Sequence, residues 1–299
     1  MVVGLVGCGK WGRHILRDLR SLGCEVPVVA RSEESRARAE EGGANAVVAE
    51  IASLAGVDGV VVATPTSTHA AVLEQVLELE VPVFCEKPLC DDADAAAQLA
   101  AHAPDRLFVM DKWRYHPGVL ELAAIARERR LGAISGLRTL RFGWGNPHDD
   151  VDDVWVLAPH DLSIALEVLN RVGRPEAAAA QWLDGAAVQL SGVLRGDGWW
   201  HVLEVSSRSP ERTRRIELHC EEGVAALAGG WDEHVSVYRE GVDGVEEERI
   251  ETPGELPLLA ELRAFIEHLA GGPPPRSTAV EGAAIVAAII ELRRLAGVP

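Results

Sequence analysis

Short apolar runs alternate with amphipathic segments along the first third of the chain. Consecutive apolar residues such as Val60-Val61-Val62 indicate strands that are buried on both faces, which is typical of a parallel sheet covered by helices. The pattern predicts strands over residues 2–6, 26–30, 59–63, 82–85 and 107–110, and helices over residues 11–22, 34–42, 68–79 and 91–102. Alternating strands and helices of this kind predict a doubly wound α/β sheet of the Rossmann type.

The pattern changes after about residue 115. Helices are predicted over residues 117–130, 159–169, 256–270 and 280–295, and strands over residues 134–144, 186–194, 199–207, 212–219, 224–228 and 235–238. Successive strands with no helix between them predict a large, mostly antiparallel open sheet in an α+β domain. We therefore expect a Rossmann domain over residues 1–115 and an α+β domain with C-terminal helices over residues 116–299.

Length and charge restrict the possible partners. A chain of 299 residues with 47% hydrophobic residues is large enough for two cores. Its longest apolar run, residues 283–290, is far shorter than the roughly 20 residues that span a bilayer. The N-terminus lacks the positive segment and cleavage site of a signal peptide. A net charge of −17 argues against nucleic acids and anionic membranes as partners.

The cysteines indicate a reducing compartment. Their number is odd, they form no Cys-x-x-Cys pair, and no histidine lies at metal-ligand spacing from them. The five are Cys8, Cys24, Cys85, Cys90 and Cys220. We expect reduced thiols in a cytoplasmic protein, with no metal site.

A glycine-rich turn follows the first predicted strand. Residues 7–12 (Gly-Cys-Gly-Lys-Trp-Gly) fit the pattern G-x-G-x-x-G and open an amphipathic helix. In that context glycines permit a tight turn and let a pyrophosphate approach the N–H groups of the helix N-terminus. We predict that this turn binds a dinucleotide through Gly7, Gly9, Lys10, Trp11 and Gly12.

The end of the second predicted strand bears on the choice of cofactor. NAD-specific proteins carry an acidic residue there, about 20 positions past the glycines, which binds the ribose hydroxyls. Here the position holds Arg31-Ser32, and a guanidinium with a hydroxyl suits a 2′-phosphate. This favours NADP(H) over NAD(H). The alternative is that Arg31 lies on the adenine or in solvent, with Glu33 and Glu34 admitting NAD.

Lysine is rare, with only Lys10, Lys87 and Lys112 among 29 basic residues. Lys87 stands in Glu86-Lys87-Pro88, directly after a predicted strand and so at the edge of the sheet where ligands bind. An ammonium group there can donate to a substrate hydroxyl oxygen and stabilise the alkoxide that develops during hydride transfer. The alternative is a solvated loop lysine.

Taken in order, four further motifs accompany the glycine turn. They are residues 63–69 (Ala-Thr-Pro-Thr-Ser-Thr-His), 86–89 (Glu-Lys-Pro-Leu), 114–117 (Arg-Tyr-His-Pro) and 158–162 (Ala-Pro-His-Asp-Leu). With them the sequence resembles the glucose-fructose oxidoreductase / inositol dehydrogenase (Gfo/Idh/MocA) family, strongly over residues 1–170 and loosely thereafter. The resemblance implies hydride transfer between a nicotinamide and a hydroxyl or keto carbon of a sugar, polyol, cyclitol or nucleotide-linked sugar. It also implies a homo-oligomer, a dimer or tetramer, formed through the open sheet.

The resemblance also implies roles for individual residues. It assigns the nicotinamide and ribose side of the cofactor to Thr64, Pro65, Thr68 and His69. Glu86 and Lys87 are assigned to both the nicotinamide and the reacting centre, with Lys87 and His160 as the acid/base groups. The substrate is assigned to Arg114, Tyr115 and Asp161. Pro88 is a candidate for a cis peptide bond. His69 is equally well interpreted as a buried, hydrogen-bonded residue at a helix start. His160 is expected in the first turn of its helix, because proline precedes it.

One position departs from the family pattern. Many relatives carry an aspartate four residues before the histidine, and here Val156 occupies that place. Proton transfer is then left to Lys87 with His160. The departure motivates a rival hypothesis, a cofactor-binding regulator or scaffold that has lost catalysis. A third hypothesis is a glycosidase that uses NAD transiently.

Residues 143–153 combine aromatic, amide and carboxylate groups, which suit sugar hydroxyls but are equally typical of a solvated surface loop. His148, Asp149 and Asp150 lie in this loop, yet no second ligand cluster accompanies them, and we expect no metal.

Overall fold

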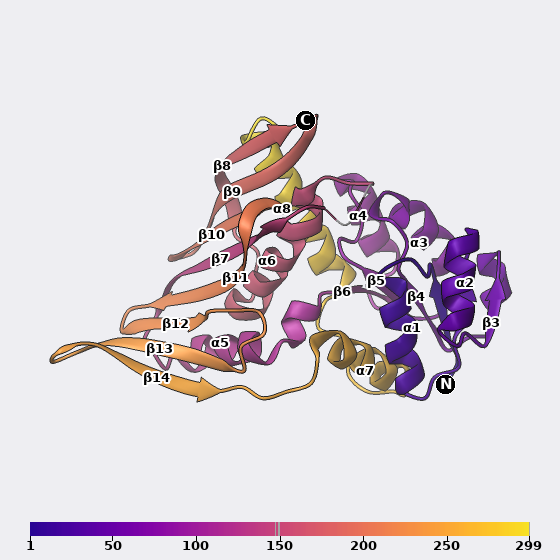
Figure 1. Ribbon diagram of the computed structural model, residues 1–299, viewed down its shortest axis with the longest axis horizontal. Helices are drawn as coiled ribbons and strands as arrows, with labels where there is room; N and C mark the ends of the chain where they lie inside the picture. Colours follow the sequence, from indigo (N-terminus) through magenta and orange to yellow (C-terminus); the bar gives the residue numbers. More distant parts are fainter. Residues whose placement is uncertain (147, 149, 299) are drawn as a thin grey trace. The chain divides into compact units, whose positions relative to one another are not determined.

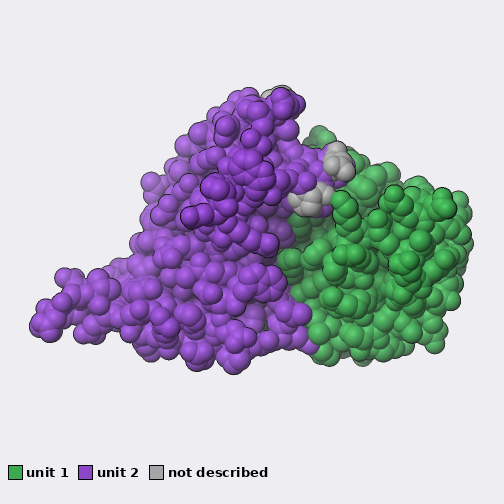
Figure 2. Space-filling view, viewed as in Figure 1, with its two compact units in different colours: residues 1–112, 258–286 green, residues 113–257, 287–299 purple. Residues whose placement is uncertain are grey.

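A computed structural model of the protein describes residues 1–146, 148 and 150–298. The chain divides into two compact units, residues 1–112 with 258–286 and residues 113–257 with 287–299 (Figure 2). Each unit is described by itself below.

The first unit is built on a parallel sheet of six strands in the order β3-β2-β1-β4-β5-β6 (Figure 1). The strands are β1 (Val3–Val6), β2 (Pro27–Val29), β3 (Ala46–Val48), β4 (Gly59–Val62), β5 (Val83–Glu86) and β6 (Leu107–Met110). The helices of this part of the chain are α1 (Gly12–Ser21), α2 (Glu33–Glu41), α3 (His69–Leu77) and α4 (Ala93–His102). The strand order is that of a dinucleotide-binding Rossmann sheet, and the expected doubly wound sheet is confirmed.

Strand β3 is absent from the sequence-based expectation. It is only three residues long, and its first residue is exposed. Such a segment carries little apolar pattern and becomes a strand because β2 provides parallel partners for Ala46, Val47 and Val48. Two short 3₁₀ helices, η1 (Ile51–Leu54) and η2 (Thr66–Thr68), follow β3 and β4.

Helix α7 (Pro257–Leu269) packs in the first unit, although it follows the second sheet in sequence. Its Phe265 is fully buried and stacks on Phe84 of β5, with ring centroids 5.0 Å apart. Gly59 leaves room for this helix, since a Cβ there would lie 2.8 Å from the side chain of Leu269. The placement differs from the expected grouping of both C-terminal helices with the α+β domain. Helix α8 (Ala279–Leu295) contributes residues to both units.

The second unit contains a sheet of eight strands in the order β14-β13-β12-β11-β7-β10-β9-β8. The strands are β7 (Ile134–Trp144), β8 (Arg174–Leu183), β9 (Ala186–Gly196), β10 (Trp199–Ser206), β11 (Arg208–Cys220), β12 (Gly223–Leu227), β13 (His234–Gly241) and β14 (Gly244–Glu251). All neighbouring pairs are antiparallel except β7 and β10. The expected α+β unit with a large, mostly antiparallel sheet is therefore confirmed.

Helices α5 (Pro117–Glu128) and α6 (Asp153–Leu169) supply the second core. Leu122 of α5 and Ile164 of α6 join the inward residues Leu137, Ile216 and Leu218 of β7 and β11 in one buried cluster. Residues 137–142 of β7 alternate between buried and partly exposed, as a sheet with one covered face requires.

Strands β8 and β14 were not expected from the sequence. β8 is rich in alanine, and β14 contains Glu246, Glu247 and Glu248 in succession. Both lie at edges of the sheet, where a strand needs little apolar pattern because it pairs on one side only. In Figure 1, β13 and β14 form a long hairpin at one end of this sheet.

Among the described residues, no helix is long and apolar enough to cross a membrane. The five cysteines are all free thiols in the structure, and four of them are buried.

Candidate active site

The glycine turn between β1 and α1 has the geometry of a phosphate-binding turn. Gly7 has a φ of +94°, and a Cβ there would lie 2.6 Å from the carbonyl oxygen of Ala63. A Cβ on Gly12 would lie 2.4 Å from the carbonyl oxygen of Gly7, so only glycine permits this approach of helix to strand. Gly9, in contrast, has no atom within 4 Å of a Cβ position, and no side chain caps the helix at Trp11. The turn therefore leaves open space at an uncapped helix N-terminus, which fits a pyrophosphate.

The end of β2 carries the residues on which cofactor preference was predicted. Arg31 is exposed, and Ser32 caps helix α2 by accepting a hydrogen bond from the Ser35 N–H at 3.2 Å. The hydroxyl of Ser35 accepts from the N–H of Cys8 at 3.1 Å and so ties α2 to the glycine turn. The role of Ser35 was not predicted from the sequence. Its position three residues after Ser32 indicates a helix cap, but it does not reveal a contact with Cys8, which lies 27 residues away.

The turn after β4 is held by its own polar side chains. Thr68 donates its hydroxyl proton towards the Pro65 carbonyl at 2.7 Å, and its oxygen lies 2.9 Å from the Thr64 hydroxyl. His69 is 1% exposed, with Nδ1 2.9 Å from the Pro88 carbonyl oxygen and Nε2 3.0 Å from that of Thr64. His69 therefore joins this turn to the loop after β5, as in the buried, hydrogen-bonded interpretation of this residue. Its role towards the cofactor stays a prediction.

Glu86 and Lys87 lie at the carboxyl end of β5. The indole N–H of Trp11 donates to Oε1 of Glu86, and the backbone N–H of Lys87 donates to Oε2 at 3.1 Å. Both oxygens of the buried Glu86 carboxylate are thus engaged in linking the glycine turn to the loop that carries Lys87. The Lys87–Pro88 peptide bond is cis, as the proline led us to consider.

Three further charged residues surround this loop and were not identified from the sequence. Lys112 places its ammonium group 4.2 Å from the centre of the Trp11 ring. Asp111 and Glu261 are fully buried, and the carboxylate oxygens of Glu261 have no hydrogen-bond partner among the described residues. Burial raises the pKa of Glu261 well above its usual value, and the charge of Glu86 raises it further while Lys112 opposes the shift. Glu261 lies on α7, so no local sequence pattern could predict its position near Glu86. For Lys112, the one signal in the sequence was the scarcity of lysine.

His160 lies in the middle of a helix, and the expectation of a first-turn position was wrong. Helix α6 begins at Asp153, because the Asp152 carboxylate accepts from the N–H groups of Val154 at 3.2 Å and Trp155 at 3.4 Å. The helix continues through Pro159. The cap and first turn of this helix were not predicted, because the aspartates at this point of the sequence are typical of a loop.

Val156 lies one turn before His160 on the same helix and is buried. The departure from the family pattern is therefore at the expected place in the helix, where a valine side chain has no polar atom to orient an imidazole.

Asp161 and Arg114, both predicted to contact substrate, are engaged in buried ion pairs. Asp161 is 1% exposed and accepts from Nε of Arg141 at 2.7 Å. Burial raises the pKa of Asp161, and Arg141 opposes this shift. Nε of Arg114 lies 3.0 Å from the Glu167 carboxylate, also on α6. Tyr115 is partly exposed in the 3₁₀ turn η3 (Lys112–Tyr115). Substrate contact by these residues stays a prediction.

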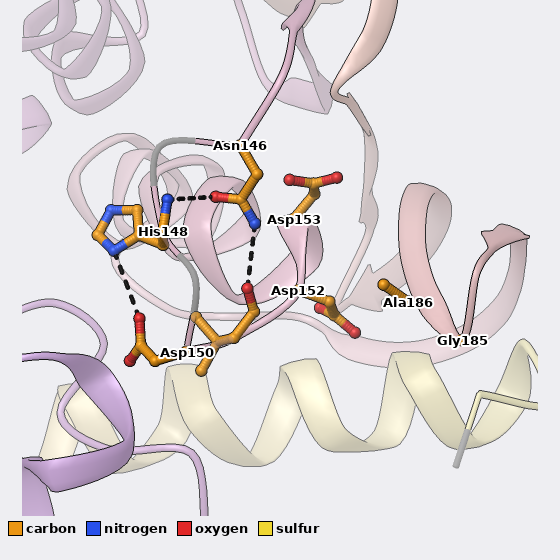
Figure 3. A pocket seen from close by; sticks show the side chains of 8 residues that line it. Asn146, His148, Asp150, Asp152, Asp153, Gly185 and Ala186 are labelled. Atoms are coloured by element: carbon orange, nitrogen blue, oxygen red, sulfur yellow. Dashed lines mark hydrogen bonds and ion pairs between the residues drawn. The ribbon is translucent and has the colours of Figure 1, made fainter.

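The loop before α6 borders an open hollow of about 490 Å³ in the second unit. Figure 3 shows the Asn146 side chain bridging the backbone of His148 and Val151, and Asp152 and Asp153 also line the hollow. Pro147 and Asp149 of this loop lie outside the described residues. Nδ1 of His148 is 3.8 Å from the Asp150 carboxylate. No group of residues suited to hold a metal ion occurs in the described part of the chain, and neither His160 nor Asp161 lines the hollow.

Comparison with known proteins identifies the first unit most clearly. Residues 1–110 match the family model GFO_IDH_MocA, described as an oxidoreductase family with an NAD-binding Rossmann fold. A Streptomyces leeuwenhoekii protein named myo-inositol dehydrogenase Hyg17 is 33% identical over 145 residues, which cover 46% of this chain and 45% of that protein.

Similarity over the whole chain extends to a second kind of dehydrogenase. UDP-N-acetylglucosamine 3-dehydrogenase of Acidithiobacillus ferrooxidans is 26% identical over 306 residues, covering 98% of this chain and 96% of that protein. Its solved structure superposes with a TM-score of 0.85 at 25% identity, covering 99% and 97% of the two chains. A levoglucosan dehydrogenase solved with NADH and levoglucosan shares the fold, with a TM-score of 0.89 at 15% identity over 99% and 97% of the chains. Residues 1–110, which form the Rossmann part of the chain, are therefore similar to the GFO_IDH_MocA family of NAD-binding oxidoreductases.

Proposed function

We propose that the protein is an NAD(P)-dependent dehydrogenase or reductase that acts on a hydroxyl or keto carbon of a sugar, cyclitol or nucleotide-linked sugar. The observation that carries the proposal is the pair of hydrogen bonds that Glu86 accepts from the Trp11 indole and from the Lys87 backbone. They connect the glycine turn to the residue that carries an ammonium group at the carboxyl end of β5. The named relatives, which act on inositol and on a UDP-linked sugar, support this substrate class.

In this proposal the first unit holds the cofactor. The glycine turn and the N–H groups at the start of α1 bind the pyrophosphate, with Lys10 and Trp11 beside it. The turn of Thr64, Pro65, Thr68 and His69 borders the nicotinamide and ribose. A bound nicotinamide supplies the hydride-transfer chemistry, and the residues of the chain supply binding and proton transfer.

Lys87 and His160 are the proposed acid/base groups. The ammonium of Lys87 donates to the substrate oxygen and stabilises negative charge on it, and the imidazole of His160 takes up or returns the hydroxyl proton. Arg114, Tyr115 and Asp161 position the substrate. Since Asp161 is bonded to Arg141, we assign its influence to the orientation of that arginine.

NADP(H) is the proposed cofactor, on the strength of Arg31 and Ser32. Arg31 is exposed, so its guanidinium can pair with a 2′-phosphate, and Ser32 can donate its hydroxyl proton while its oxygen caps α2. This preference favours reduction of a ketosugar in the cell.

The free cysteines favour the cytoplasm as the place of action. The open sheet of the second unit, with Trp182 36% exposed on β8, is the proposed interface of a homo-oligomer, a dimer or tetramer.

One experiment separates this proposal from its rivals. The protein is purified, any retained nicotinamide is identified by mass, and turnover is measured with ketosugars, polyols, nucleotide-linked sugars and glycosides. A dehydrogenase oxidises or reduces at least one of them with equal change in cofactor. Cofactor binding without any turnover would support the regulator suggested by Val156, and glycoside cleavage without net cofactor change would support the glycosidase.

A further inference from the structure

Two arginines face each other across neighbouring strands of the second sheet. Arg141 of β7 and Arg214 of β11 are direct partners in the strand register. They share the sheet face on which Leu137 and Ile216 enter the core, because each lies an even number of residues from one of them. Like charges in directly opposite positions destabilise a sheet. Such an arrangement therefore requires anions to compensate it.

One of the two cations is compensated within the protein. Arg141 is 3% exposed, and its Nε and Nη2 donate to the two oxygens of Asp161 at 2.7 and 3.4 Å. Its guanidinium also lies 4.5 Å from the centre of the Trp113 ring. The side of Arg141 that can grip a carboxylate with two parallel bonds is thus already in use.

The other cation is not compensated in this way. Arg214 is partly exposed, and its Nη1 donates to the carbonyl oxygens of Phe142 and Thr213. Its Nε and Nη2 have no hydrogen-bond or ion-pair partner in the part of the chain that the structure describes. Burial and the charge of Arg141 lower the pKa of Arg214 to about 10, so the group stays cationic at neutral pH. The arginine pair therefore has one carboxylate for two positive charges.

The free edge of Arg214 is fixed in place. Nη1 is anchored to two backbone carbonyls, and the Gly230 backbone approaches so closely that a Cβ there would lie 3.1 Å from Cβ of Arg214 and 2.9 Å from the Trp113 ring. A guanidinium held at one end presents its Nε–Nη2 edge in a set direction, which suits two parallel bonds to one oxyanion.

We propose that Arg214 binds an oxyanion of the substrate through its Nε–Nη2 edge, so that the substrate is a negatively charged sugar derivative. This inference rests on the proposed function and narrows its substrate class. Asp161, which compensates Arg141, directly follows His160 on α6, so the arginine pair contacts the helix that carries the proposed acid/base group. A ring carboxylate and a phosphate of a phosphorylated or nucleotide-linked sugar share this chemistry, and the experiment distinguishes them.

The test is calorimetric titration of the cofactor-loaded protein with glucose, glucuronate, glucose 1-phosphate and UDP-glucose. The variants are Arg214→Gln and Arg214→Lys. Lysine keeps the positive charge but cannot form two parallel hydrogen bonds to one oxyanion. Arg215→Gln is the matched control, because Arg215 is the next residue on β11, points to the opposite face and pairs with Glu217 at 2.6 Å. Thermal unfolding of each variant checks that it folds; if Arg214→Gln does not, Arg214→Lys carries the test.

We expect wild type to bind at least one anionic probe more tightly than glucose, and Arg214→Gln to weaken that binding about tenfold or more, as loss of a hydrogen bond to a charged group does. Arg214→Lys should fall between them, and Arg215→Gln should match wild type. Preference for glucuronate identifies a carboxylate, and preference for the phosphorylated probes identifies a phosphate. Equal binding of glucose and the anions, or anion binding unchanged in folded Arg214 variants, would overturn the inference. Because titration needs no turnover, Arg214-dependent anion binding by a protein without dehydrogenase activity would reject the proposed function and keep this subsite.

Discussion

Lys87 is positioned by the carboxylate of the residue before it. Oε2 of Glu86 accepts from the Lys87 N–H, and Oε1 accepts from Trp11, so the backbone at Lys87 is fixed independently of its ammonium group. Lys87→Met should therefore leave the glycine turn and the backbone at residue 87 in place and lower kcat by about 10²- to 10⁴-fold, the usual contribution of an acid/base group. Lys87→Arg is the companion variant. It keeps the charge, and it should not restore the full rate, because a planar guanidinium cannot take the position of the compact ammonium that donates to the substrate oxygen. Equal turnover of wild type and Lys87→Met would remove lysine from the mechanism.

Arg31 decides the cofactor preference in this account. Arg31→Asp should weaken NADPH binding about tenfold or more, since it removes a charge-assisted bond and adds repulsion, and should leave NADH binding the same or tighter. Fluorescence titration with both cofactors measures this. Arg127→Asp, an exposed position on α5, makes the same change in net charge and should affect neither cofactor. NADPH affinity that is equal in Arg31→Asp and wild type would place Arg31 in solvent.

Glu261 makes stability depend on pH. Its folded-state pKa is raised, chiefly by burial, so the native protein keeps a proton that the unfolded chain loses above the usual glutamate pKa of about 4.3. The native state is then favoured at low pH and loses up to about 1.4 kcal/mol of stability per pH unit above that value, until the raised pKa is reached. Glu261→Gln imitates the neutral acid and removes this dependence.

The prediction is tested by urea unfolding of wild type and Glu261→Gln at several pH values between about 5 and 8. The two proteins should differ little at the acidic end, and the glutamine variant should become the more stable one as pH rises. Glu267→Gln, exposed on the same helix, should follow wild type throughout. A constant difference between wild type and Glu261→Gln would mean that Glu261 is ionised in the native protein.

In the turn between β1 and α1, different glycines serve folding and cofactor binding. A methyl group on Gly12 would meet the Gly7 carbonyl at 2.4 Å, whereas one on Gly9 meets no protein atom within 4 Å. Gly12→Ala should lower the free energy of unfolding by about 1–3 kcal/mol, as overpacking does. Gly9→Ala should fold with nearly wild-type stability and lose cofactor affinity, because the methyl group occupies the space expected for the pyrophosphate. Tight cofactor binding by Gly9→Ala would show that the pyrophosphate lies elsewhere.

Elements with a strong apolar pattern could be predicted, and those that depend on a partner could not. The runs that became β1, β4, β5 and β6 are buried along their whole length, so their pattern survives without knowledge of the fold. β3, β8 and β14 are short, alanine-rich or acidic, and each lies at the edge of its sheet. Helix α6 was expected to begin later because Pro159 suggested a start, while the actual cap is Asp152.

The same distinction applies to the candidate site. The glycine turn and the Glu86-Lys87-Pro88 segment are continuous in sequence, so their motifs could be recognised. Glu261 beside Glu86, and Arg214 opposite Arg141, come together only through helix packing and strand register. No spacing in the sequence encodes these contacts.

On the scale of the whole molecule, a net charge of −17 coexists with local sites for anions. Uncapped N–H groups at α1, the exposed Arg31 and the half-compensated arginine pair on β7 and β11 each present positive charge at one place. Such sites admit a cofactor and a substrate that both carry negative groups, while the overall charge still disfavours nucleic acids.

Transfer of a deuterium label tests the central claim most directly. The protein is mixed with NADPH deuterated at C4 of the nicotinamide and with ketosugars, including negatively charged ones, and the products are analysed by mass. The account predicts one deuterium per product molecule, on the carbon that gains the hydroxyl group, and loss of this transfer in Lys87→Met. Cofactor that binds tightly yet keeps its label with every sugar would contradict it.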